Sequence, residues 1–133
     1  MRVMFDTNIL ISAVISYGTR LAELTQKIAD DFNIVLSSQI IEELQMAVEM
    51  KFPHKKYAFD RFMSKLSFEM VFTPTEIYPD IYPKIRDKKD YPILASAILA
   101  DVDVFITGDK DFSAVYIERP EVMTIAEFAS KYL

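Results

Sequence analysis

Residues 2–8 read RVMFDTN, and this stretch decides the fold that we expect. The apolar run from Arg2 to Phe5 is short and unbroken, which is typical of a strand buried on both faces. Asp6 follows it directly, and helical character begins at Thr7. A carboxylate therefore falls at the point where a buried strand gives way to a helix.

The rest of the chain repeats this alternation of strand and helix. Strands are expected at 2–5, 32–36, 68–72, 104–107 and 122–123. Helices are expected at 7–14, 21–28, 59–66 and 92–98, the last with Pro92 in its first turn. Another helix is expected after the N-cap Ser37-Ser38, with Ile41, Leu44 and Val48 on one face. A final helix is expected to begin at the capping box formed by Thr124 and Glu127. The pattern predicts an α/β fold, a three-layer α/β/α arrangement around a central parallel sheet. In such sheets ligands bind beyond the C-terminal strand ends, where the strand order reverses.

Length and composition predict a single globular domain over residues 1–133. Hydrophobic residues make up 51% of the chain, enough for a sizeable core. The longest apolar run, Ile9 to Ile15, is too short for a transmembrane span, so no membrane association is expected. The absence of cysteine excludes disulfides, thiolate zinc sites and cysteine nucleophiles. A cytoplasmic protein fits these features.

The net charge of −5 bears on the kind of partner. A protein that coats nucleic acid by neutralising phosphates is usually basic, so this class is disfavoured. A nuclease is not excluded, because divalent cations in a carboxylate pocket reverse its local charge.

Four acidic residues are predicted to converge at one edge of the sheet. Asp6 ends the first strand and Asp109 follows the fourth, so both leave the same edge. Asp90 lies at the start of a helix, where the dipole favours a carboxylate, and Glu43 lies in the second turn of the helix after the second strand. The simpler interpretation of Asp6 is an N-cap of its helix.

Such a cluster needs a cation. Two carboxylates 4 Å apart repel each other by roughly 4 kcal/mol at an effective dielectric constant of 20. Oxygen ligands, with one remote histidine at His54, suit Mg²⁺ or Mn²⁺. One or two such ions could activate a water for in-line cleavage of a phosphodiester.

Four motifs together resemble those of the PIN-domain family, and in particular its VapC-like toxin ribonucleases. They are MFDTN at 4–8, SSQIIEEL at 37–44, DYPILASA at 90–97 and TGDKDF at 107–112. The resemblance spans nearly the whole chain. It implies a Mg²⁺- or Mn²⁺-dependent endoribonuclease acting on RNA, often paired with an antitoxin protein and often a homodimer.

The resemblance also assigns the site. The residues that match the acidic quartet, as catalytic residues and metal ligands, are Asp6, Glu43, Asp90 and Asp109. Asn8 and Thr107 match polar residues that support the quartet. Three assignments stay open: Glu42 in place of Glu43, Asp87 in place of Asp90, and Asp111 as a fifth acid.

Two other functions are weighed against a nuclease. A haloacid-dehalogenase-type phosphatase also places an Asp after strand one, but it needs a second Asp where this chain has Asn8. A non-catalytic module that binds RNA or protein is the other. The basic run from Lys51 to Lys65 is interpreted as a solvated helix face with aromatic side chains turned inward, with RNA binding as its alternative.

Overall fold

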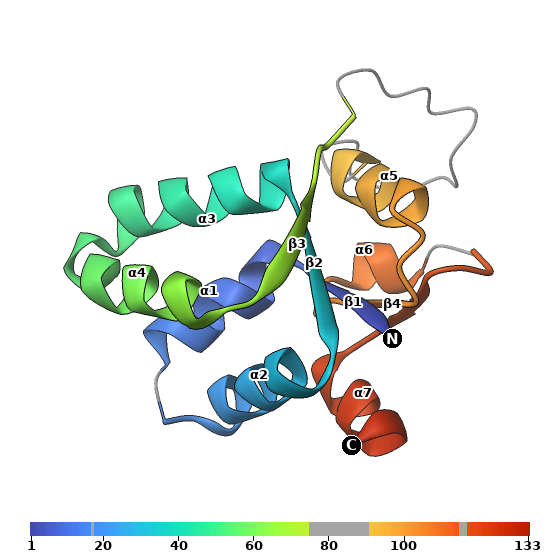
Figure 1. Ribbon diagram of the computed structural model, residues 1–133, viewed down its shortest axis with the longest axis horizontal. Helices are drawn as coiled ribbons and strands as arrows, with labels where there is room; N and C mark the ends of the chain where they lie inside the picture. Colours follow the sequence, from blue (N-terminus) through green and yellow to red (C-terminus); the bar gives the residue numbers. More distant parts are fainter. Residues whose placement is uncertain (17, 75–90, 115–116) are drawn as a thin grey trace.

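The central sheet is parallel throughout, with the strand order β3-β2-β1-β4-β5 (Figure 1). The computed structural model describes residues 1–16, 18–74, 91–114 and 117–133. The strands are β1 Arg2–Phe5, β2 Asn33–Ser37, β3 Phe68–Val71, β4 Val104–Ile106 and β5 Glu121–Met123. The helices are α1 Thr7–Ile15, α2 Arg20–Asp31, α3 Ser38–Lys51, the 3-10 turn η1 Pro53–Lys55, α4 Lys56–Lys65, α5 Tyr91–Leu99, α6 Lys110–Ser113 and α7 Ile125–Tyr132.

The predicted three-layer α/β/α architecture is confirmed. Helices α1 to α4 gather on one side of the sheet, and α5 and α6 lie on the other (Figure 1). The chain moves from β1 outward to β3 and then returns to add β4 and β5 on the other side of β1. The strand order therefore reverses between β1 and β4, where a ligand site is expected.

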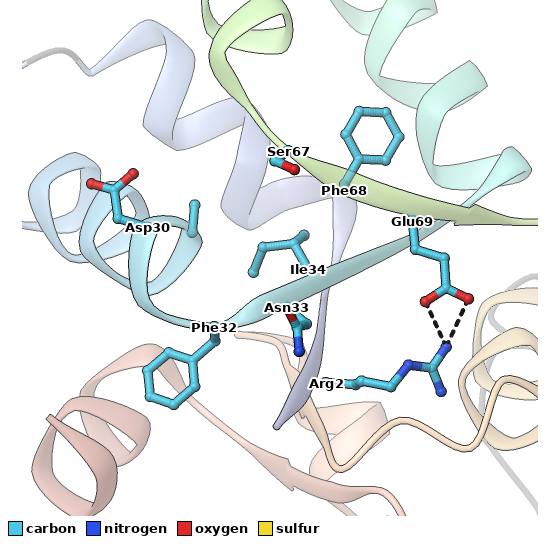
Figure 2. A pocket seen from close by; sticks show the side chains of 9 residues that line it. Arg2, Asp30, Phe32, Asn33, Ile34, Ser67, Phe68 and Glu69 are labelled. Atoms are coloured by element: carbon cyan, nitrogen blue, oxygen red, sulfur yellow. Dashed lines mark hydrogen bonds and ion pairs between the residues drawn. The ribbon is translucent and has the colours of Figure 1, made fainter.

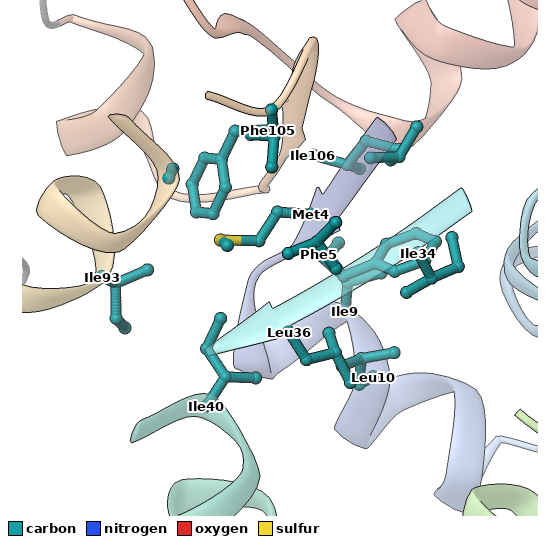
Figure 3. Packing of buried hydrophobic residues seen from close by; sticks show 14 of the residues in the cluster. Met4, Phe5, Ile9, Leu10, Ile34, Leu36, Ile40, Ile93, Phe105 and Ile106 are labelled. Carbon is teal, nitrogen blue, oxygen red and sulfur yellow. The ribbon is translucent and has the colours of Figure 1, made fainter. Parts of the chain in front are cut away.

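The core explains why the inner strands are continuous apolar runs. In β1 and β4, residues 3–5 and 104–106 are buried, as are residues 34–37 of β2. Met4, Phe5 and Phe105 lie at the centre, between helices on both faces (Figure 3). β3 is an edge strand, and its central residues Glu69 and Met70 are exposed.

Polar caps fix where the helices begin, as predicted for Ser37 and Thr124. Ser37 accepts a hydrogen bond from the Ile40 backbone N–H, and Thr124 accepts one from the Glu127 N–H. A Ser, Thr or Asp at this position satisfies one of the free N–H groups of the first turn.

Some sequence expectations need correction. The buried stripe of α3 runs through Ile40, Leu44 and Val48, whereas Ile41 is only partly buried. Thr107 lies just beyond β4, and the short helix α6 was not expected. The sequence also predicts that the region of Pro74, Pro79 and Pro83 is irregular, and Pro79 and Pro83 lie outside the described residues. None of the helices in the described ranges has the length and apolar character to span a membrane.

Candidate metal centre

Asp6 lies at the C-terminal end of β1, next to the point where the strand order reverses. Its side chain is only 6% exposed. One carboxylate oxygen accepts a hydrogen bond from the Thr7 backbone N–H (2.8 Å), so Asp6 caps α1 as the simpler interpretation predicted. The other accepts a hydrogen bond from the Thr107 hydroxyl (2.8 Å). The cap therefore accounts for only part of what holds this carboxylate.

Thr107 connects Asp6 to Asp109. Its buried hydroxyl donates to Asp6 and accepts a hydrogen bond from the Asp109 backbone N–H (3.0 Å). Asp109 then caps α6, because one of its carboxylate oxygens accepts from the Asp111 N–H (2.9 Å). A single threonine thus fixes the relation between the ends of β1 and β4.

Glu43 is held close to Asp6 by two polar neighbours. The Thr7 hydroxyl donates to one carboxylate oxygen (2.7 Å), and the Gln39 side-chain amide donates to the other (2.9 Å). Glu42, the alternative that the sequence left open, is exposed. The structure therefore places Glu43, and not Glu42, on the side of α3 that faces the start of α1.

The sequence interpretation overlooked Thr7 and Gln39. Gln39 precedes Glu43 by four residues, a spacing that puts both side chains on one face of a helix, so this contact was available from the sequence. Thr7 had no such signal, because its contact with Glu43 depends on how α1 packs against α3.

The electrostatics of Asp6 are unfavourable to its charge. Burial raises the pKa of the Asp6 carboxyl, and the hydrogen bonds from Thr107 and Thr7 lower it. The negative charges of Asp109 and Glu43 raise this pKa further. Both of these charges are negative, and a bound cation would offset them.

The other predicted site residues are less constrained. Asn8 is exposed near the start of α1, and Asp111 is half-buried in α6. Asp90 and its alternative Asp87 lie outside the described residues. The helix that begins immediately after Asp90, α5, contacts α3 and β2.

The donor set fits a hard divalent cation. Carboxylate oxygens are the ligands that Mg²⁺ and Mn²⁺ prefer, and a buried carboxylate among like charges is a typical place for such an ion. Within residues 1–16, 18–74, 91–114 and 117–133, no three acidic or histidine side chains stand close enough to form a complete site. Asp6, Glu43 and Asp109 are thus neighbours that would need to close around an ion.

A hollow of about 350 Å³ lies at the opposite edge of the sheet, at the N-terminal ends of β1, β2 and β3 (Figure 2). The Arg2 guanidinium there donates to both carboxylate oxygens of Glu69 (3.1 and 3.0 Å) and to the Ala100 carbonyl. Arg2 and Glu69 therefore satisfy each other's charge, and β1 separates the hollow from Asp6.

Comparisons with known proteins agree with this fold. Residues 2–111 match the sequence profile of the PIN domain. One chain of the crystal structure of VapBC2 from Rickettsia felis, bound to a DNA fragment from their promoter, is similar in fold, with a TM-score of 0.67, 21% identity, and coverage of 92% of this chain and 97% of that chain. The PIN domain of human SMG5 aligns over 100% of both chains, with a TM-score of 0.54 and 13% identity. No curated protein matches the sequence. The match over residues 2–111 shows that the chain belongs to the PIN domain family.

Proposed function

We propose that the chain is a Mg²⁺- or Mn²⁺-dependent endoribonuclease that hydrolyses RNA phosphodiester bonds as the toxin of a toxin-antitoxin pair. Membership of the family supports the broader statement, because PIN domains are generally nucleases. The observation that carries the proposal is the buried Asp6 carboxylate, whose pKa is raised by burial and by the nearby charges of Asp109 and Glu43. Negative charges gathered around a buried carboxylate in this way would be offset by a divalent cation.

Some residues of the site would bind the ion, and others would position the residues that bind it. Asp6, Glu43 and Asp109 would hold the ion through carboxylate oxygens, with Asp90 as the fourth acid. A divalent ion supplies positive charge and Lewis acidity for hydrolysis of a phosphodiester. Thr107 keeps Asp6 in place through its hydroxyl.

Ligand orientation is the second part of the proposal. Thr7 and Gln39 each hold one oxygen of Glu43, which keeps the carboxylate turned toward α1. Asn8 and Asp111 are proposed as supporting residues, because both lie in the first turn of a helix that begins at the site. Such contacts restrict a ligand to the orientation that it needs.

The neighbouring residues Glu43 and Glu42 allow a matched test. We expect Glu43→Gln to reduce cleavage of a structured RNA in Mn²⁺ by more than the roughly 10- to 100-fold that is typical when a group orienting a ligand is removed. Glu42→Gln changes the same charge on the exposed side of α3 and should retain activity. EDTA should abolish cleavage by the wild type. Activity that survives EDTA, or equal activity of the two variants, would contradict the proposal.

The two other functions predict different results. A non-catalytic module would show neither RNA cleavage nor Mn²⁺ binding by calorimetry. A haloacid-dehalogenase-type phosphatase would form an acyl phosphate on Asp6, and the PIN domain match gives that function no support.

The expected partners follow from the same proposal. The similar Rickettsia felis structure is a VapBC2 assembly on promoter DNA, and this supports an antitoxin protein as a partner here. A homodimer and a cytoplasmic location remain predictions. Loss of RNA cleavage when the chain is mixed with a small DNA-binding protein encoded beside it would support the antitoxin assignment.

A further inference from the structure

Positive charge in this chain is concentrated in residues 51–65, which run from the end of α3 through α4. Residues 51–65 contain five of the fifteen Lys and Arg residues but one of the twenty Asp and Glu residues, so the segment carries +4 and the remainder −9. We call Lys51, His54, Lys55, Lys56 and Tyr57 the basic tip. These residues form the end of α3, the turn η1 and the start of α4, and the hairpin projects away from the sheet (Figure 1).

The cations of this segment are available for a ligand. Within the described residues, Lys56 pairs with Asp60 (3.5 Å) on the solvent-exposed surface, and Lys51 and Lys55 form no ion pair. Lys51 lies in the last turn of α3, where the helix dipole favours a cation. The dipole of α3 does not explain why the cations of η1 and α4 are there.

Tyr57 departs from the expectation that the aromatic residues of this segment turn inward. Its side chain is 77% exposed, whereas Phe59 is buried as expected. Proteins bind single-stranded nucleic acids with exposed aromatic rings among cations, because bases stack on the ring and phosphates pair with the cations.

The tip is joined to the metal centre by one face of α3. Gln39, Glu43, Met46 and Met50 are spaced by three or four residues, so they share that face. Met46 and Met50 are 62% and 78% exposed. From Glu43 to Lys51 the helix rises by roughly 12 Å, which is about three to four nucleotides of a stacked strand.

We propose that the basic tip binds the phosphates and a base of single-stranded RNA three to four nucleotides away from the scissile phosphate. This inference rests on the proposed ribonuclease function and adds a second contact region on the substrate. RNA is favoured over an acidic protein because the surface continues along α3 from the site where RNA would be cleaved. The tip supplies the phosphate-binding charge that the acidic remainder of the chain lacks.

The first test measures affinity for a fluorescein-labelled, 16-nucleotide single-stranded RNA of mixed sequence, in EDTA over a range of salt concentrations. EDTA prevents both cleavage and binding through a metal ion. For Lys51→Ala/Lys55→Ala/Lys56→Ala we expect the slope of log affinity against log salt to fall by about 2, which makes binding roughly 100-fold weaker at 0.1 M than the wild type. The matched control, Arg20→Ala/Lys27→Ala/Lys131→Ala, removes three exposed cations elsewhere and should keep the wild-type slope.

Tyr57 gives an independent measurement. Tyr57→Ala should weaken binding roughly 5- to 100-fold, the usual effect of losing one stacked base, whereas Tyr57→Phe keeps the ring and should bind as the wild type does. Equal affinities of these two variants would contradict a stacking role. If Tyr57 were only an exposed surface residue, the alanine and phenylalanine variants would bind RNA equally well.

Cleavage in Mn²⁺ separates this inference from the proposed function. The triple tip variant should cleave a 4-nucleotide RNA as the wild type does and lose activity on the 16-nucleotide RNA. If the wild type cleaves RNA and the tip variant binds RNA with unchanged affinity, the RNA-binding role of the tip is wrong and the proposed ribonuclease function still stands. Absence of cleavage of either RNA by the wild type would overturn the nuclease. Unchanged RNA affinity with altered sedimentation of the tip variant would assign the surface to a second copy of the chain and overturn the inference.

Discussion

The hydroxyl of Thr107 should contribute about 1.5–4 kcal/mol to the fold, because it bonds to both Asp6 and Asp109. Thr107→Val keeps the shape of the side chain and removes the hydroxyl. Thr107 is 2% exposed, so water cannot easily take the hydroxyl's place. The variant leaves a buried carboxylate oxygen of Asp6 and the Asp109 N–H without their partner.

The expected loss follows from these two groups. A hydrogen bond to a charged group is worth about 1.5–3 kcal/mol, and the half-buried Asp109 N–H adds up to roughly 1 kcal/mol. We therefore expect Thr107→Val to lower the free energy of unfolding by about 1.5–4 kcal/mol. Thr107→Ser is the control, because it keeps the hydroxyl and loses a methyl group at a cost of about 1 kcal/mol.

Urea unfolding in EDTA at pH 7, monitored by far-UV circular dichroism, measures this difference. The midpoint of Thr107→Val should fall well below that of Thr107→Ser, with an unchanged slope. The loss should shrink at acidic pH, since the hydrogen bond from Thr107 lowers the pKa of Asp6 and a protonated Asp6 needs it less. Equal stability of the valine and serine variants would refute the role given to this hydroxyl.

Two further predictions concern charge and pH. Burial holds the pKa of Asp6 above its ordinary value, so the stabilisation by Asp6 is present at acidic pH and is lost as pH rises through the folded-state pKa. In EDTA, Asp6→Asn should remove this loss of stability in melting curves recorded from pH 4 to 8. A variant with the pH dependence of the wild type would contradict this prediction. The Arg2 backbone N–H and then the Arg119 side chain lower the pKa of Asp103, so its stabilisation is present at neutral pH and is lost as pH falls below the ordinary aspartate range. Asp103→Asn should therefore be less stable than the wild type at pH 7 and approach it at pH 3, and a gap that stays constant between these pH values would count against this account.

Much of the fold could be predicted because its signals are local. Continuous apolar runs such as residues 2–5 and 104–106 indicate strands buried on both faces, and the Ser37 and Thr124 caps mark helix starts. The apolar face of α3 was misjudged by one residue, at Ile41 in place of Ile40, because both are apolar and the packing of the helix decides between them.

The candidate site was predictable in its position and less so in its contacts. Strand ends placed Asp6 and Asp109 at one edge, as the parallel sheet requires. The choice between Glu42 and Glu43 depends on which side of α3 faces α1, and the sequence does not state that packing. Tyr57 was predicted to turn inward, but it lies at the end of a hairpin that projects from the sheet and is exposed there.

The central claim is that carboxylates remote in sequence bind one divalent cation at the C-terminal edge of the sheet. Anomalous diffraction from a crystal soaked in Mn²⁺ tests it most directly. We predict a peak within roughly 2–2.5 Å of carboxylate oxygens of both Asp6 and Asp109, the range for oxygen ligands of hard divalent ions. A fully soaked crystal with no peak between these two side chains would contradict the claim.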